Sequence, residues 1–280
     1  MRMHRYAYFL ICQNFSQKNA MIFGFFRKLA LSLHCFYAVM LIQTKALVLR
    51  TVTFADRKII VDMFTHTHGR MSFIVVVPNS PRAKMKKQFF QPLTLLELSL
   101  DYRQHLSLQR IKEVRIAMPY TSLTSHPHKL SISLFVAEFL CHALKSEQQN
   151  ELLFHYIIDS MLWLDNCPSG FANFHIVFMM RLSRFLGFYP NLDDYHAGSV
   201  FDLQAACFVG TLPAHRYFLS ATDSAAMRVM MRMDFPTMHL FRMSHEERNR
   251  LVEAIITFYR LHLPDFPELR SLEVLKELYG

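Results

Sequence analysis

Two histidines one residue apart come closest to a catalytic pattern in this sequence. His66 and His68 form a His-Thr-His pair that could place two imidazoles on one metal ion. A metal-dependent hydrolase built on this pair would need further histidine or carboxylate ligands on other strands, and no comparable cluster follows in this part of the sequence. We interpret both histidines as solvated turn residues, and the hydrolase remains the alternative.

A second group of possible metal ligands is scattered through residues 193–215. Its spacing lacks the regular pattern of a structural zinc site, so we predict no metal there. The group comprises Asp193, Asp194, His196, Cys207 and His215.

Other catalytic patterns are missing. The sequence contains no Gly-x-Ser-x-Gly elbow and, with only 7 glycines, no glycine-rich phosphate loop. The 5 cysteines show no Cys-x-x-Cys pair and are typical of free thiols in a reducing, cytoplasmic setting. We therefore predict a protein that is not an enzyme and binds no cofactor.

A basic segment between two apolar runs is the most informative feature. A polar turn does not require four cations, whereas nucleic acid requires cations for its phosphates and aromatic faces on which unpaired bases stack. We interpret the segment as a DNA-binding loop, although at least one of its two phenylalanines is expected in a core. The segment carries Arg82, Lys84, Lys86 and Lys87, directly before Phe89 and Phe90. Further predicted DNA-binding cations are Lys45, Arg50, Arg57, Lys58, Arg70 and Arg103.

Charge is distributed unevenly along the chain. Residues 40–118 hold 13 Lys and Arg against 5 Asp and Glu, whereas residues 119–280 hold 13 against 17. A basic front half joined to a mildly acidic back half indicates a polyanion-binding module followed by a domain with another task. The simpler interpretation of this charge is a solvated basic face, and a further alternative function is a scaffold whose basic face meets an acidic protein and not DNA.

Alternating apolar and polar residues predict five strands, which must position the basic loop. They cover residues 42–54, 58–65, 70–77, 89–102 and 108–118, with Pro92 weakening the start of the fourth. Gly69 supplies the positive φ that the turn before the third strand requires. In the first strand, one face would carry Thr44, Ala46 and Val48, and the other Lys45, Leu47 and Leu49. Five short strands in about 80 residues predict a small closed or nearly closed barrel.

The apolar period becomes helical after a turn-rich linker at residues 119–129. Helices are predicted over residues 130–146, 150–164, 171–187, 224–233 and 244–263. Ser244 and Glu247 match a capping box at the start of the last helix. The predicted fold class is α+β, with an N-terminal OB-fold barrel over residues 40–118 followed by an all-α helical domain over residues 119–280.

Residues 1–39 differ from the rest of the chain. They contain 5 Lys and Arg, no acidic residue and no unbroken apolar span long enough for a transmembrane helix, so no membrane attachment is expected. We interpret them as a mis-assigned or disordered extension upstream of a natural start at Met40, with a targeting segment as the alternative.

Four segments in this order resemble the bacterial recombination mediator family RecO. They are "TKALVLRTVTFADRKIIVDMFTHTHGRMSFIVV" (residues 44–76), the basic loop leading into "QPLTLLELSL" (91–100), "FMMRLSRFLGFYPNL" (178–192) and "FYRLHLPDFPELRSLEVLKELYG" (258–280). The resemblance implies a DNA-repair protein that binds single- and double-stranded DNA and anneals complementary strands. It further implies that the protein works with RecR to load RecA onto DNA coated by single-stranded DNA-binding protein, with RecF and RecA as further partners. Its implied place of action is the nucleoid.

The resemblance also implies two local features of the helical domain. The acidic tail of single-stranded DNA-binding protein would need cations beside an apolar groove, and Arg181 and Arg184 are the candidates. Many RecO proteins carry a four-cysteine zinc site after the "LGFYPNL"-like segment, where this chain has Cys207 alone. The zinc of those relatives is therefore expected to be missing.

The sharpest expectation concerns the basic loop of the barrel, where Lys84, Lys86 and Lys87 are predicted to contact phosphate.

Overall fold

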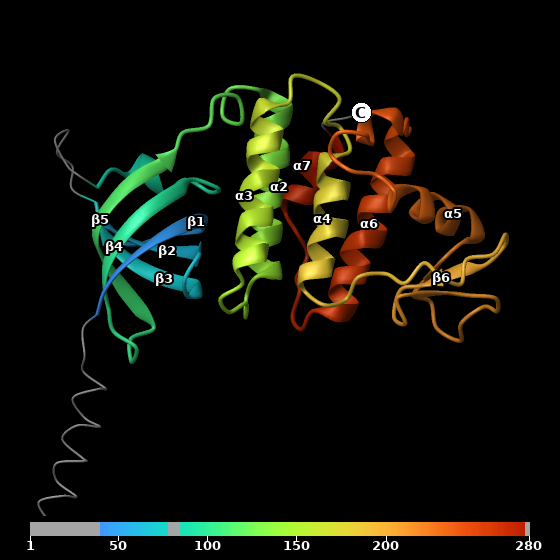
Figure 1. The fold of residues 1–280 in the computed structure, drawn as a ribbon, viewed down its shortest axis with the longest axis horizontal. Helices are drawn as coiled ribbons and strands as arrows, with labels where there is room; N and C mark the ends of the chain where they lie inside the picture. Colours follow the sequence, from blue (N-terminus) through green and yellow to red (C-terminus); the bar gives the residue numbers. More distant parts are fainter. Residues whose placement is uncertain (1–39, 78–84, 278–280) are drawn as a thin grey trace, which may run out of the picture.

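The computed structural model describes residues 40–77 and 85–277 (Figure 1). The interpretation of residues 1–39 and the predictions for Arg82 and Lys84 lie outside the described residues. Figure 1 shows a barrel at one end of the molecule, helices in the middle and a small sheet at the far end.

Five strands form a closed barrel, as the sequence predicted. They are β1 (Met40–Ala55), β2 (Lys58–Thr65), β3 (Gly69–Val76), β4 (Leu95–Tyr102) and β5 (Leu108–Met118). The strand order is β1-β2-β3-β5-β4, with β4 returning to pair with β1. Neighbouring strands are antiparallel except β3 and β5, which run parallel from the Ser72–Leu108 pair onward. This arrangement is OB-like and leaves no free sheet edge.

Strand β1 is buried on both faces over its middle section. Ala46 and Val48 point into the barrel core, as the alternation predicted. Leu47 and Leu49, on the opposite face, belong to the core of the helical domain. The strand therefore joins the two domains, and its exposed Lys45 lies just outside this double-sided region.

The predicted start of the fourth strand at Phe89 is wrong. Residues Lys87–Phe90 form a short 3-10 helix, η1, and β4 begins only at Leu95. Phe90 is 1% exposed inside the barrel core, and its carbonyl accepts a hydrogen bond from Thr51 Oγ1 at 2.6 Å. Leu93 has a positive φ of 64° and donates its N–H to Val48 O, so the chain turns sharply before it enters the sheet.

Six α-helices are described beyond the barrel, and the predicted helices correspond to five of them. They are α2 (Pro127–Ala143), α3 (Glu151–Asn166), α4 (Phe174–Phe185), α5 (Ala221–Met230), α6 (His245–His262) and α7 (Ser271–Glu277). The capping box of Ser244 and Glu247 at the start of α6 is confirmed. Helix α7 was not predicted, because 7 residues give too little periodicity to detect. None of the helices described is long and apolar enough to span a bilayer.

The second domain also contains a small sheet that the sequence analysis missed. Its strands are β6 (Val200–Asp202), β7 (Cys207–Val209) and β8 (Phe218–Leu219), in the order β7-β6-β8. Strands of two or three residues are too short to show an alternation. Burial of Phe201 and Phe208 holds the sheet on the domain, and Leu203 O is hydrogen-bonded to His262 of α6 at 2.9 Å.

One outer face of the barrel contributes to the hydrophobic core of the helical domain, while the barrel interior forms a second core. Figure 1 shows α2 and α3 as the helices next to the barrel. Barrel residues that belong to the helical core are Leu47, Leu49, Phe64, Leu93 and Leu95. Such a shared core fixes the orientation of the two domains, since parting them would expose these side chains to water.

One carboxylate anchors the linker between the domains. Asp165, in the last turn of α3, is 6% exposed and accepts backbone N–H groups from Thr121, Ser122 and Leu123 at 2.7–3.1 Å. Burial raises the pKa of Asp165, but these donors lower it by more, so the pKa lies below its ordinary value. The carboxylate is therefore ionised at neutral pH and holds the linker against α3.

We expect Asp165→Ala to lower the free energy of unfolding by about 3 kcal/mol, because three backbone N–H groups of the linker, that of Leu123 buried, lose their acceptor. Urea denaturation monitored by circular dichroism measures the effect. The control is Asp159→Ala, which removes an exposed carboxylate from the same helix and should change stability by about 0.5 kcal/mol or less. Equal losses in the two variants would contradict the anchoring role.

Candidate nucleic-acid interface

Exposed cations lie where the basic loop leaves the barrel, beside the β1–β2 turn, and where its description resumes. Arg57 occupies the turn with a positive φ of 69°, and Lys58 begins β2. The Arg57 carbonyl accepts the N–H of Val77 at 2.8 Å, so the basic loop leaves the barrel beside this turn. Lys86 and Lys87, where the description of that loop resumes, are also exposed. We call Arg57, Lys58, Lys86 and Lys87 the basic rim.

The two phenylalanines of the basic loop do not face solvent. Phe90 is buried in the barrel, and Phe89 is half-buried against the same core, which confirms the expectation that at least one is a core residue. A different aromatic residue is exposed beside the basic rim. Phe54 is 63% exposed and lies three residues before Arg57 on β1. Sequence reasoning missed Phe54 because its position inside an apolar strand gives no sign of exposure.

Arg50 and Arg70 are held by one buried carboxylate between β1, β2 and β3. Asp62 accepts Arg50 Nε at 2.7 Å, Arg70 Nη2 at 3.1 Å and Ser72 Oγ at 2.5 Å. Burial raises the pKa of Asp62, but the hydrogen bonds from Ser72 and Arg50 and the two positive charges lower it by more. Asp62 is therefore ionised and neutralises part of the charge that the sequence assigned to DNA.

Arg70 points toward the helical domain and not toward the basic rim. Its side chain is 15% exposed, and its guanidinium also donates to the carbonyl of Cys141 on α2. Arg50 is more accessible, with a side chain 56% exposed. The structure thus gives Arg70 a contact between the domains, which the sequence could not show because Cys141 lies 71 residues further along the chain.

The remaining predicted cations of the barrel are exposed but lie apart from the basic rim. Lys45 is paired in the β1–β4 register with Glu97, which also accepts Arg115 Nε at 2.6 Å. Arg103 lies in the loop after β4, where its backbone is hydrogen-bonded to the buried side chain of Gln109. Strand β5 adds exposed cations that the prediction omitted, namely Arg110, Lys112 and Arg115. The two-residue spacing of Arg110 and Lys112 was the signal that could have identified that pair.

The two arginines predicted to bind the acidic tail are exposed on α4. Arg181 Nη2 donates to Met233 O at 3.3 Å, and the Arg184 guanidinium lies 5.0 Å from the centre of the Tyr189 ring. Both keep donors available to solvent, and the Tyr189 ring gives Arg184 an aromatic neighbour.

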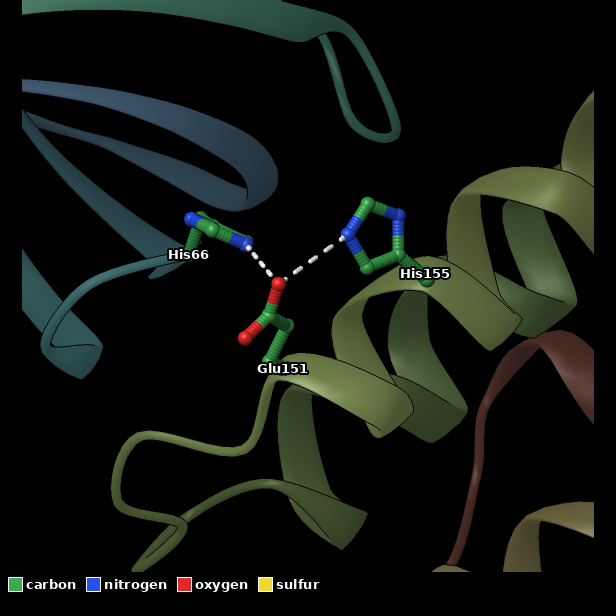
Figure 2. Close-up of side chains that lie close together, drawn as sticks. All are labelled: His66, Glu151 and His155. Carbon is green, nitrogen blue, oxygen red and sulfur yellow. Dashed lines mark ion pairs between the residues drawn. The ribbon is translucent and has the colours of Figure 1, made fainter.

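The histidines of the β2–β3 turn point in different directions. His68 packs on Tyr102, with 4.8 Å between ring centres, and its Nδ1 is 2.8 Å from Thr67 Oγ1. His66 instead faces α3, where Glu151 and His155 lie close to it (Figure 2). The structure therefore does not bring His66 and His68 together as one ligand pair.

Comparison with known proteins assigns the chain to a family. The family model for the N terminal part of recombination protein O matches residues 40–120, and the model for its C terminal part matches residues 125–273. The chain belongs to the RecO family. It is 50% identical over 241 residues to the DNA repair protein RecO of Bacteroides fragilis and 48% identical to that of Phocaeicola vulgatus. Each alignment covers 86% of this chain and 100% of the relative. Family membership gives the chain a role in DNA repair.

The four-cysteine zinc site expected of many RecO proteins does not fit the residues of this chain. Cys207 is half-buried on β7 and is the region's single cysteine. His215 Nε2 instead pairs with Asp202 Oδ2 at 3.2 Å, linking the loop before β8 to β6. The small sheet and its aromatic packing hold this segment.

Proposed function

We propose that this chain is a DNA-binding recombination mediator that performs no bond chemistry. It binds single- and double-stranded DNA, anneals complementary strands and works with RecR to load RecA onto DNA coated by single-stranded DNA-binding protein, with RecF as a further partner. Its site of action is the nucleoid in the cytoplasm.

The observation that carries this proposal is the combination of the basic rim with exposed Phe54 on an OB-like barrel. Phosphates are attracted by the four cations, and unpaired bases stack on a solvent-exposed ring. Helices α2 and α3 cover the barrel face that carries Leu47 and Leu49, whereas the basic rim and Phe54 are exposed and accessible to a long polymer. Annealing needs a surface that neutralises two backbones and leaves base edges free, and a short basic rim meets this requirement.

The acidic tail of single-stranded DNA-binding protein is proposed to bind on α4. Arg181 and Arg184 would pair with its carboxylates, while the Tyr189 ring beside Arg184 offers an apolar contact. Tail binding on the helical domain leaves the basic rim free, so one molecule could hold the tail and the DNA together.

The test is titration of a fluorescently labelled single-stranded oligonucleotide at several salt concentrations. We expect Lys58/Lys86/Lys87→Ala to weaken binding about 100-fold at 0.1 M salt and to make the slope of log K against log salt shallower by about 2, because three phosphate contacts are lost. The control variant, Arg216/Arg232/Arg242→Ala, removes three exposed cations from the helical domain. An unchanged slope in the barrel variant, or equal changes in both variants, would rule out the basic rim as the DNA site.

Phe54→Ala should separate base stacking from charge. We expect roughly 5- to 100-fold weaker binding of single strands, little change for duplex DNA and an unchanged salt slope, because stacking on one ring is lost and no cation is removed. The same anisotropy titration measures it, with Leu240→Ala, an exposed apolar residue 67% accessible on the helical domain, as the control. Equal weakening for single strands and duplex would contradict a stacking role.

A further inference from the structure

Three possible metal ligands meet at the junction of the barrel and the helical domain. His66 comes from the β2–β3 turn, and Glu151 and His155 come from the first turns of α3 (Figure 2). A search of residues 40–77 and 85–277 for three or more histidine, cysteine or carboxylate side chains close enough to share one ion finds this one group. The sequence could not show the group, because the two parts are separated by 85 residues and meet only in the folded chain.

The distances fit a small divalent ion with little rearrangement. Glu151 Oε1 lies 3.5 Å from His66 Nε2 and 3.8 Å from His155 Nε2, and all three donor atoms lie within 4.8 Å of one another. Zinc bonds of about 2.0–2.1 Å in a tetrahedron separate neighbouring ligand atoms by roughly 3.4 Å. Rotation of exposed side chains is enough to close the remaining difference.

The backbone under the three side chains is already fixed. The N–H of His66 donates to Lys45 O at 2.9 Å, and the N–H of Arg70, after the same turn, donates to Glu147 O at 3.1 Å. On the other side, the Asn150 side chain caps α3 by accepting the N–H of Leu153. Glu151 and His155 are one helical turn apart, so their side chains project from the same face. The β2–β3 turn and the start of α3 are therefore held in place without an ion, and only the three side chains need to adjust when one binds.

A simple ion pair explains this arrangement less well than a metal. Two imidazoles share one carboxylate oxygen, and exposed pairs of this kind contribute little to stability. Two neutral imidazoles and a carboxylate are, by contrast, a common zinc ligand set that leaves a fourth position for water. The side chains of His66, Glu151 and His155 are 31%, 65% and 57% exposed, so an ion can reach them without unfolding.

We propose that His66, Glu151 and His155 bind one divalent transition-metal ion, with zinc as the best match and water at the fourth position. The ion links the β2–β3 turn to α3 and thereby fastens the barrel to the helical domain. This site is separate from the Cys207 region, and it does not depend on the proposed DNA-binding surface.

The test is titration of the chelator-treated full-length protein with zinc chloride in competition with a chromogenic chelator. We expect one ion per chain, with at least tenfold weaker binding in each of His66→Gln, Glu151→Gln and His155→Gln. His68→Gln is the matched control, because it removes an imidazole from the same turn that faces Tyr102. Binding kept by all three ligand variants, lost equally in the control, or missing in the unmodified protein would overturn the proposal.

A second measurement reports the link between the domains. Because the ion binds only the docked arrangement, zinc should raise the melting temperature of the unmodified protein and of His68→Gln. The same zinc concentration should leave the melting temperatures of the three ligand variants unchanged. Cobalt in place of zinc should give visible absorption bands that disappear in His155→Gln. A zinc-dependent shift that persists in the ligand variants would place the ion elsewhere.

Discussion

Replacing Gly69 with alanine should destabilise the protein by about 3 to 5 kcal/mol, well beyond the cost of an unfavourable φ alone. Gly69 has φ +65° in the β2–β3 turn, and a Cβ placed there would lie 2.4 Å from the carbonyl carbon of Gln148. Both Gln148 O and Glu147 O would also lie within 2.7 Å of it. These are backbone atoms, so no side-chain rotation can relieve the overlap, and the turn must move away from the helical domain.

The chain contains a matched control for this prediction. Gly187 and Gly198 also have positive φ, +86° and +89°, but a Cβ on either would meet nothing within 4 Å. Alanine at these two positions should therefore cost only about 1 to 2 kcal/mol, the penalty of a left-handed conformation. Guanidinium denaturation of the three variants measures the difference. A Gly69→Ala cost no greater than that of Gly187→Ala would show that the close approach of the two backbones carries no weight.

The expected loss is large because several contacts depend on the same turn. When it moves, the Arg70 N–H loses Glu147 O, and the Arg70 guanidinium is drawn away from Cys141 O. The Arg70 guanidinium would keep Asp62 as its partner within the barrel but would lose its acceptor on α2. Phe64 and Phe154, whose ring centres are 6.1 Å apart, would also separate. The barrel and the helical domain are thus joined at a point where a single methyl group matters.

The sequence predicted most of the secondary structure because its local signals agree with the fold. Strands β2 and β5 have the predicted bounds, since each is a run of branched and alternating residues ended by turn residues. Helix α6 begins where the capping box indicated. The predicted start of β4 was wrong because two adjacent aromatic residues, Phe89 and Phe90, are common in strands. Phe90 instead lies at the end of a 3-10 helix and fills the barrel interior. Local pattern cannot distinguish these two uses of an aromatic residue.

The candidate site was less predictable, because charge in a sequence does not show where a side chain points. Lys58, Lys86 and Lys87 are exposed, and their role in DNA binding stays a prediction. Arg70 looks the same in the sequence, yet it is paired with Asp62 and Cys141 O. Those partners are fixed by barrel closure and by docking of α2, both of which are long-range events. Exposure of Phe54 likewise depends on how far β1 extends beyond the helices.

Stability should fall as pH is lowered from 7 to 5, chiefly because of His175. This histidine, near the start of α4, is 1% exposed, with its ring edge-on to Phe135 at 6.1 Å. Burial, assisted by the positive charge of Arg248, lowers its pKa from 6.5 to about 3. Below pH 6.5 the unfolded chain therefore takes up a proton that the folded chain refuses, and the free energy of unfolding falls until the pH approaches 3.

The size of this effect follows from the difference in pKa. Each pH unit between the two values costs about 1.4 kcal/mol, so the loss between pH 7 and pH 5 should be about 2 kcal/mol. Carboxylates with lowered pKa, such as Asp62 and Asp165, act in the same direction but only at lower pH, because their ordinary pKa is 3.8. Burial also lowers the pKa of His142, where the charge of Glu138 opposes the shift, so its share should be smaller.

Urea denaturation at half-unit intervals between pH 7 and pH 5 tests the assignment. His175→Gln should be less stable than the unmodified protein at pH 7 but should lose most of the dependence on pH, because glutamine does not titrate. His142→Gln should remove a smaller part of the slope. A slope that survives in His175→Gln would mean that the folded protein accommodates a charged imidazole at this position. The DNA and zinc titrations should be carried out near pH 7, because protonation then stabilises the unfolded chain very little.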